Sequence, residues 1–343
     1  MVSRWEKLEK KLKEKNLDAF ILTRSVDIFY FSGLWIEGVA LLTSEKKFIV
    51  TSPMYEEQIK GEEDEWEVIV CEDSLEEKLG ELGSSLDIRR CGFQANHLSF
   101  ARYKKIKEKF KPQLIPCNAT VEKIRSIKDE EEINLIRKAG EITLQAFEYL
   151  KKALHTGITE KEATRELVSY ILKEADGVSF DPIVLFGERT SLPHGHPTER
   201  KLKENELILV DAGAKVKGYC ADITRTFAWG KIPKKWKKIY NLAYNIEKRA
   251  IKHIKPKIKA STIDKIIREK LAEAGYEKKF LHGTGHGVGL EVHEEPFLNR
   301  NSNAILEEGM VVTIEPGIYF AGEGGVRVEN MVLVTNKGGK ILP

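Results

Sequence analysis

The sequence predicts an α/β domain followed by an α+β domain. Through the first third of the chain, short apolar runs alternate with charged, amphipathic runs. In the remainder, long helical patterns are grouped between sets of strand-like runs. The proline-containing stretch 112–118 separates the two patterns, so we expect domains at 1–117 and 118–343.

The elements expected in the first domain follow from short apolar runs and one amphipathic start. Trp5, Leu8 and Leu12 mark one face of an opening helix. Strands are expected at 18–23, 38–43, 47–51, 67–71 and 90–94, and helices near 75–82 and 100–110. This domain contains one histidine, which favours a scaffold rather than a chemical site.

The second domain opens with two long helical patterns. The first covers 129–154, and the second begins at a capping box made by Thr159 and Glu162 and runs to about 175. Strand-like runs follow, then two more helical patterns at 236–253 and 262–274, then further strands.

Composition excludes several classes of protein. Lys and Arg number 56 against 53 Asp and Glu, and this balance argues against a protein built to hold nucleic acid or an anionic membrane. The four cysteines form no C-x-x-C pair, and the first 15 residues lack an apolar leader. No apolar run approaches the roughly 18 residues of a membrane span. We therefore expect a cytoplasmic protein.

An acidic pattern occurs twice in the second domain. The apolar runs 207–213 and 310–317 each contain a carboxylate, Asp211 or Glu315, followed closely by glycine. Asp222 and Glu329 each stand four positions after a glycine in a later strand-like run. Asp211 and Glu315 are 104 positions apart, and Asp222 and Glu329 are 107 apart. This repetition predicts two similar half-domains whose four acids converge on one pocket.

Four carboxylates in one buried pocket would repel each other and lose hydration. Divalent cations are the natural compensation. A glycine-rich stretch, 281–290, places His282 and His286 where alternating glycines let the backbone pack closely, and His293 follows. Neutral imidazole is a good ligand for transition metals, so these histidines favour a metal site.

These motifs resemble those of the pita-bread metallopeptidases, a group of Xaa-Pro dipeptidases (prolidases), Xaa-Pro aminopeptidases and methionine aminopeptidases. The matching stretches are Asp211, Asp222-Ile-Thr-Arg-Thr-Phe, His282-Gly-Thr-Gly-His286-Gly-Val-Gly-Leu, Val292-His293-Glu294, Glu315-Pro-Gly and Gly325-Val-Arg327-Val-Glu329-Asn330. The first domain is also similar to the amino-terminal domain of the proline-specific members. The resemblance implies a creatinase-like amino-terminal domain and a catalytic pita-bread domain with pseudo-twofold halves.

The resemblance also implies roles for individual residues. The metal ligands would be Asp211, Asp222, His286, Glu315 and Glu329. Glu315, His293 and His194 would act in catalysis, and His282, Arg327 and Phe297 would contact substrate. Two divalent ions are implied, Mn²⁺ or Co²⁺ first, with Fe²⁺ or Zn²⁺ open. Asp222 would bind one ion and His286 the other, with Asp211 and Glu329 bridging.

The activity implied is hydrolysis of the Xaa-Pro bond at the N-terminus of dipeptides or short peptides by an activated hydroxide. The partners would be small peptides with proline second, with no nucleic acid and no membrane, and the chain would form a homodimer. Phe297, Phe180 and Ile183 are candidates for an apolar wall against the proline ring.

One departure keeps alternatives open. Many prolidases carry an arginine where this chain has Phe297, and Arg300 stands nearby but displaced. An Xaa-Pro aminopeptidase acting on longer peptides is therefore an alternative. A metal-free binding protein on the same fold and a creatinase-like hydrolase are others, although relatives of those kinds have typically lost ligands.

Overall fold

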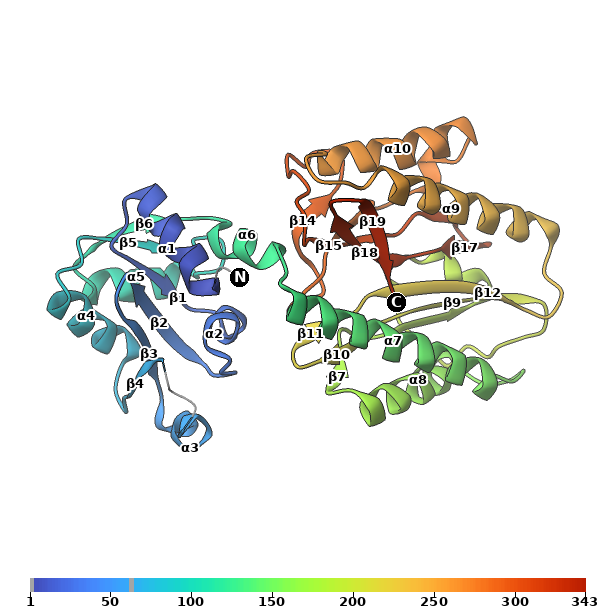
Figure 1. Cartoon of the computed structure of the whole chain (residues 1–343). Coiled ribbons are helices and arrows are strands. Elements are labelled where there is room, and N and C mark those ends of the chain that lie inside the picture. Colours follow the sequence, from blue (N-terminus) through green and yellow to red (C-terminus); the bar gives the residue numbers. More distant parts are fainter. Residues whose placement is uncertain (1–2, 62–64) are drawn as a thin grey trace. The chain divides into compact units, whose positions relative to one another are not determined.

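The computed structural model describes residues 3–61 and 65–343. The chain divides into two compact units, Met1–Arg125 and Ser126–Pro343, and Figure 1 shows the elements of each. The boundary that we expected between 117 and 118 falls just before α6 (Thr120–Ser126), the last helix of the first unit. None of the helices among the described residues has the length and apolar character needed to cross a membrane.

The first unit is built on one mixed six-stranded sheet in the order β4-β3-β2-β1-β5-β6. Its strands are β1 (Ala19–Leu22), β2 (Gly38–Thr43), β3 (Lys47–Thr51), β4 (Glu67–Val70), β5 (Arg90–Phe93) and β6 (Gln113–Pro116). Its other helices are α1 (Arg4–Lys15), α2 (Ser25–Ser32), α3 (Glu56–Ile59), α4 (Leu75–Ser85) and α5 (Phe100–Lys109), with a short 3₁₀ helix at Pro53–Tyr55. Strands β1, β5 and β6 run parallel, whereas β1–β2–β3 is an antiparallel meander. The predicted α/β class is confirmed.

The stretch that we interpreted as an interdomain boundary is partly a strand. Residues 113–116 form β6, which pairs in parallel with β5 from Arg90↔Gln113 to Phe93↔Pro116. Because β6 lies at the edge of the sheet, Pro116 can occupy it without removing an interior ladder hydrogen bond. The prolines that suggested a domain boundary are therefore compatible with an edge strand.

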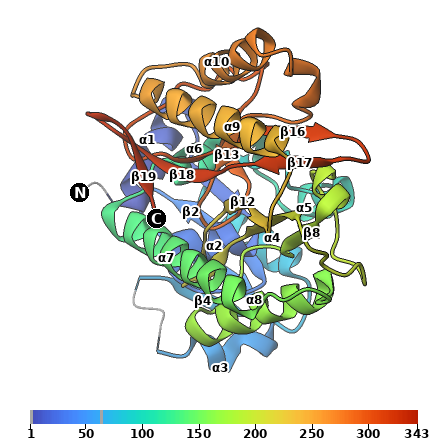
Figure 2. The ribbon, with the colours of Figure 1, turned by 90° about the vertical axis from the view of Figure 1, so that its right-hand side faces the viewer.

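In the second unit, β-sheets lie between two pairs of helices, as both views in Figures 1 and 2 show. One pair is α7 (Glu130–Ala153) and α8 (Glu160–Glu174), and the other is α9 (Lys234–His253) and α10 (Ala260–Glu273). Both α7 and α8 begin at capping boxes, at Asp129 and at the expected Thr159. This arrangement of a helix pair in each half agrees with the expected pseudo-twofold fold.

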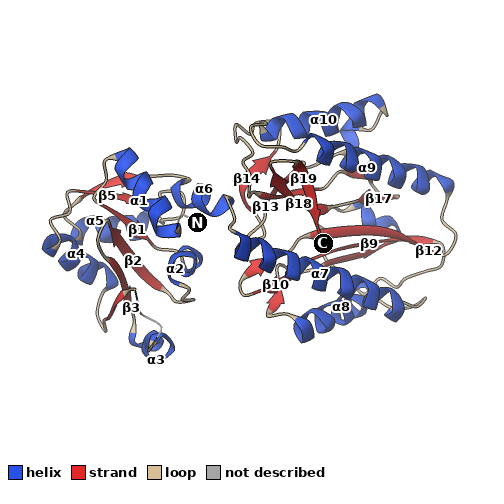
Figure 3. Ribbon diagram, in the orientation of Figure 1, coloured by secondary structure: helices blue, strands red, loops and turns tan. Residues whose placement is uncertain are grey.

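The strands of the second unit, red in Figure 3, pair in antiparallel sheets. Their orders are β12-β9-β8, β11-β10-β7, β14-β13-β15-β18-β19 and β16-β17. The strands of the first half are β7 (Gly177–Val178), β8 (Ile183–Phe186), β9 (Glu206–Ala212), β10 (Ala214–Val216), β11 (Tyr219–Cys220) and β12 (Ile223–Trp229). Those of the second half are β13 (Gly285–Gly287), β14 (Glu294–Leu298), β15 (Val311–Ile314), β16 (Gly317–Phe320), β17 (Gly324–Arg327), β18 (Asn330–Thr335) and β19 (Gly338–Leu342). Short 3₁₀ helices lie at Gly187–Ser191 and Glu277–Lys279.

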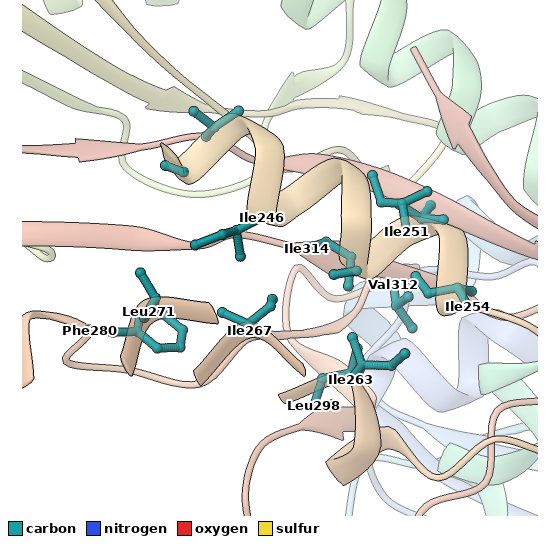
Figure 4. Close-up of a cluster of buried hydrophobic side chains, with 14 of the residues drawn as sticks. Ile246, Ile251, Ile254, Ile263, Ile267, Leu271, Phe280, Leu298, Val312 and Ile314 are labelled. Carbon is teal, nitrogen blue, oxygen red and sulfur yellow. The ribbon is translucent and has the colours of Figure 1, made fainter. Parts of the chain in front are cut away.

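A core of aliphatic side chains fixes α9 and α10 on the second half's sheet, as Figure 4 shows. It includes Ile246 and Ile251 of α9, Ile263 and Ile267 of α10, and Val312 of β15, all buried. Burying one such side chain contributes about 1.5–3 kcal/mol. The core therefore anchors the strand β15, which leads directly into Glu315.

The two later acidic runs differ from the continuous strands that we predicted. Asp222 lies in a break between β11 and β12, and Glu329 lies in a break between β17 and β18. Both acids therefore sit where the strand is interrupted at corresponding places of the two halves. The interruption frees these residues from regular side-chain alternation, so both can turn into the same pocket.

Candidate metal centre and active site

The four acids and His286 line one pocket of about 320 Å³ in the second unit. Asp211 lies at the end of β9, and Glu315 follows β15 directly. His286 is the middle residue of β13, where Gly285 lets the backbone approach Thr313, since a Cβ there would lie 1.9 Å from the Thr313 carbonyl oxygen. The structure thus brings together side chains that are far apart in the sequence.

The ligand atoms of these side chains form overlapping groups. Asp211, Asp222 and Glu329 place one ligand atom each within 4.8 Å of one another, and so do His286, Glu315 and Glu329. Glu329 belongs to both groups, which is the arrangement expected of a residue that bridges two ions. Asp222 also groups with His286 and His293, whereas Asp211 belongs to one group. Asp222 and Glu329, rather than Asp211 and Glu329, are therefore the two acids that each belong to two of these groups.

His286 is oriented as a ligand. Its Nδ1 lies 3.1 Å from the Gly287 carbonyl oxygen, so this nitrogen donates and Nε2 keeps its lone pair. Nε2 lies 3.5 Å from Asp222 Oδ2 and 3.7 Å from Glu315 Oε1. Burial lowers the pKa of His286 to about 3, which keeps the imidazole neutral at physiological pH. A neutral imidazole between two carboxylates is suited to holding a cation.

Ionisation of the buried acids is unfavourable in the metal-free protein. Burial, and then the neighbouring charge of Asp211, raises the pKa of Glu329 to about 8. Burial also raises the pKa values of Asp222 and Glu315, with Glu329 as the next cause for each. Ionising all of these groups together at neutral pH requires added positive charge.

The donor set fits divalent cations. Asp211 Oδ1 is buried and has no hydrogen-bond partner, although its other oxygen accepts a hydrogen bond from Arg327. A buried carboxylate oxygen without a donor costs free energy unless a cation faces it. Four carboxylates with one imidazole form an oxygen-rich set that suits Mn²⁺, Co²⁺ or Fe²⁺.

A hydrogen-bonded chain runs beside the acids. Arg327 donates from Nη2 to Asp211 Oδ2 at 2.6 Å and from Nη1 to the Tyr319 hydroxyl at 2.8 Å. His282 Nε2 lies 2.9 Å from the same hydroxyl, and its Nδ1 lies 2.8 Å from the Gly283 carbonyl oxygen. Burial lowers the pKa of His282 to about 3 and raises that of Tyr319 to about 12. Both side chains are therefore neutral, and this series of hydrogen bonds holds Asp211 and His282 in position.

Thr224 links Glu329 to Arg327. Its hydroxyl donates to Glu329 Oε2 at 2.6 Å and accepts from Arg327 Nε at 3.0 Å. Sequence reasoning missed both Thr224 and Tyr319. No local pattern marked Thr224 as a partner of Glu329, and none distinguished Tyr319 from a core tyrosine.

The remaining expected residues also line the pocket. They are His194, His282, His293, Arg327, Phe297, Phe180 and Ile183, and Asn299 joins them as a residue that the sequence did not indicate. The His293 and His286 ring centroids are 4.1 Å apart. Burial lowers the pKa of His293, so its imidazole is neutral as well. Arg300 does not line this pocket and instead pairs with Glu277 at 2.8 Å.

Comparison with known proteins decides the family. Residues 134–336 match the model of metallopeptidase family M24, and residues 4–127 match the creatinase/prolidase N-terminal domain. The chain belongs to metallopeptidase family M24. It is thus a metallopeptidase with a creatinase-type N-terminal domain and a pita-bread C-terminal domain, which confirms the predicted fold and class of enzyme.

Three proteins are similar to this chain over nearly its whole length. The uncharacterized peptidase YqhT of Bacillus subtilis (strain 168) is 36% identical over 340 residues, covering 98% of this chain and 96% of that protein. The Xaa-Pro dipeptidase from Bacillus anthracis has a TM-score of 0.95 and 35% identity, covering 99% and 96% of the two chains. The X-Pro aminopeptidase from Thermotoga maritima MSB8 has a TM-score of 0.90 and 32% identity, covering 99% and 97%.

Proposed function

We propose that this enzyme removes the N-terminal residue from short peptides with proline in second position. The observation that carries the proposal is the pair of ligand groups that share Glu329 within one pocket of a family M24 chain. The similarity to both an Xaa-Pro dipeptidase and an X-Pro aminopeptidase supports proline specificity.

Two divalent ions are proposed to be held by Asp211, Asp222, His286, Glu315 and Glu329. Bound there, they would supply Lewis-acid activation of water and of the scissile carbonyl. Mn²⁺ or Co²⁺ is the first choice because carboxylates dominate the donor set.

Protein side chains would move the proton and stabilise charge. Glu315 would accept the proton of the attacking water and pass it to the departing proline nitrogen. His293, neutral and facing the pocket, would donate to the oxygen on which negative charge develops. His194 would orient the residue after the cut.

Apolar residues would select proline. Phe180, Ile183 and Phe297 line the pocket and offer a wall to the pyrrolidine ring. Proline brings no N–H to the scissile bond and has a fixed φ, so such a wall need not satisfy a donor there.

The charges of the pocket favour peptides longer than two residues. Arg327 is the one Lys or Arg among the described residues that line the pocket, and its guanidinium already donates to Asp211, Thr224, Tyr319 and the Pro193 carbonyl. A dipeptide would place its C-terminal carboxylate near Phe297 without a free cation. We therefore propose that an Xaa-Pro aminopeptidase activity on tripeptides and longer peptides is at least equal to the dipeptidase activity.

A peptide panel with defined metal content tests these proposals. The metal-free protein is reloaded with Mn²⁺ or Co²⁺ and assayed on Ala-Pro, Ala-Pro-Ala and Ala-Ala-Ala. Metal-dependent cleavage of the two proline peptides, with Ala-Pro-Ala at least as good, is expected. Glu329→Gln should abolish cleavage, whereas Glu323→Gln, at an exposed acid paired with Lys235, should not. Absence of cleavage of every Xaa-Pro peptide by the loaded enzyme would refute the proposal.

A further inference from the structure

Asn299 brings a neutral hydrogen-bond donor to the wall of the pocket. It lines the pocket together with Phe297, which stands two positions earlier, and it is half-buried. Leu298 between them is buried, so Phe297 and Asn299 point to the same side of this extended segment at the end of β14. A Cβ placed on Gly283 would lie 3.6 Å from the Asn299 Cβ, so the asparagine stands beside the glycine-rich segment.

The amide of Asn299 has a defined orientation. The Asn301 backbone N–H donates to Asn299 Oδ1 at 3.0 Å, and since a backbone N–H can only donate, the atom that it faces is the amide oxygen. Among the residues that the structure describes, no group accepts a hydrogen bond from Nδ2. Asn299 thus offers N–H hydrogens that the protein itself does not use.

The other side-chain N–H donors that line the pocket have partners or roles. Arg327 and His282 form hydrogen bonds within the protein. His286 is a proposed metal ligand, and the proposed function gives roles to His293 and His194. Asn299 therefore remains as the donor without an acceptor.

The position of Asn299 along the pocket selects its acceptor. Strand β14 starts directly after His293, and Phe297 and then Asn299 follow. A peptide whose scissile carbonyl faces His293 and whose proline ring lies on Phe297 therefore continues towards Asn299. Two strand positions span roughly 7 Å, and the C=O group of the proline together with one hydrogen bond covers most of that distance.

We propose that the side-chain amide of Asn299 donates a hydrogen bond to the carbonyl oxygen of the substrate's proline residue and so contributes to specificity. This role rests on the proposed function, which supplies the Xaa-Pro substrate. In a tripeptide or longer peptide the acceptor is a neutral peptide carbonyl, and in a dipeptide it is an oxygen of the C-terminal carboxylate. A neutral donor serves both acceptors, which agrees with an activity that is not restricted to dipeptides.

A substrate without the acceptor tests this contact. Alanyl-pyrrolidide has the scissile amide and the five-membered ring of Ala-Pro but no carbonyl beyond the ring. Asn299→Ala should lower kcat/KM for Ala-Pro-Ala about 3- to 10-fold, mainly through KM, and should change that for alanyl-pyrrolidide by no more than about twofold. Where turnover of alanyl-pyrrolidide is too slow, its inhibition constant against Ala-Pro-Ala is compared instead. Equal losses on both substrates, or no loss on either, would overturn the proposal.

Two variants separate the donor from the turn that holds it. Asn299→Asp keeps an oxygen for the Asn301 N–H but replaces the NH₂ group by an acceptor, so it should lose at least as much activity on Ala-Pro-Ala as Asn299→Ala. Wild-type activity of Asn299→Asp would show that the side chain only supports the turn. Asn301→Ala, at an exposed asparagine, is the matched control and should leave both substrates unchanged, because it keeps the backbone N–H.

A binding readout is independent of turnover. The product Pro-Ala carries the same carbonyl, and its addition to the diamagnetic Zn²⁺-loaded protein should shift the side-chain NH₂ resonances of Asn299, which Asn299→Asp identifies by their loss. Unchanged resonances would overturn the contact. If the loaded wild-type enzyme cleaves no Xaa-Pro peptide but these resonances shift, the proposed function fails and the contact stands.

Discussion

Replacement of Thr224 by valine should weaken metal binding, because it removes two hydrogen bonds of the Thr224 hydroxyl. The hydroxyl is buried and bonds to Glu329 at 2.6 Å and to the charged Arg327 at 3.0 Å. A hydrogen bond to a neutral group contributes about 0.5–1.5 kcal/mol and one to a charged group about 1.5–3 kcal/mol, so we expect Thr224→Val to cost about 2–4.5 kcal/mol of unfolding free energy at pH 7, where Glu329 is protonated. Because Glu329 belongs to both ligand groups, metal affinity should also fall about 10- to 100-fold.

Thr226 provides the matched control. It is buried two positions along the same strand, and its hydroxyl bonds to the backbone oxygen and nitrogen of Arg327 at 2.9 and 3.1 Å. Thr226→Val should cost about 1–3 kcal/mol of stability and leave metal affinity nearly unchanged. Urea unfolding and titration of the metal-free proteins with Mn²⁺ measure the two quantities. Equal metal affinities of the two variants would refute the reasoning.

Three further predictions concern pH, specificity and assembly. Burial raises the pKa of Glu329 to about 8 and raises those of Asp222 and Glu315, so the stability that these acids contribute is complete below about pH 4 and is lost as pH rises towards 8. Burial lowers the pKa values of His282 and His286 to about 3, so the stability that these neutral histidines contribute is complete above about pH 6.5. Between about pH 6.5 and 8, the change in stability therefore comes from the acids. The melting temperature of the metal-free protein should therefore fall between about pH 6.5 and 8, and saturating Mn²⁺ should raise it most at pH 8; a flat metal-free profile would contradict this. Phe297→Arg should shift the ratio of kcat/KM values for Ala-Pro over Ala-Pro-Ala about tenfold or more towards the dipeptide, by offering a cation to its carboxylate; an unchanged ratio would show that this position does not read the terminus. The homodimer implied by the family resemblance predicts a sedimenting mass of two 39.0 kDa chains, and a monomer at micromolar concentration would exclude it.

Local patterns were sufficient where a segment's own residues decide its structure. The hairpin 38–43 and 47–51 appears at the expected positions, because a continuous apolar run on each side of a polar turn has few alternatives. Helix α8 begins at the predicted capping box, since Thr159 and Glu162 satisfy backbone donors without help from the rest of the fold. By contrast, the residues of β6 were interpreted as part of a domain boundary, because an edge strand is defined by its neighbour β5 and not by its prolines.

The amino-acid sequence by itself indicated the kind of site: four acids at repeated offsets and a histidine in a glycine run favour binding of divalent cations, because ionised carboxylates that are buried together repel one another. Only the tertiary structure decided how these side chains group: Glu329 and Asp222 each belong to two groups of possible ligands, and both residues lie in breaks between strands that no local pattern marks. The hydrogen bonds of Thr224 with Glu329 and of Tyr319 with His282 likewise join residues that are 105 and 37 positions apart in the sequence. A hydrogen bond or ion pair of this kind belongs to two distant segments at once, and packing alone brings them together.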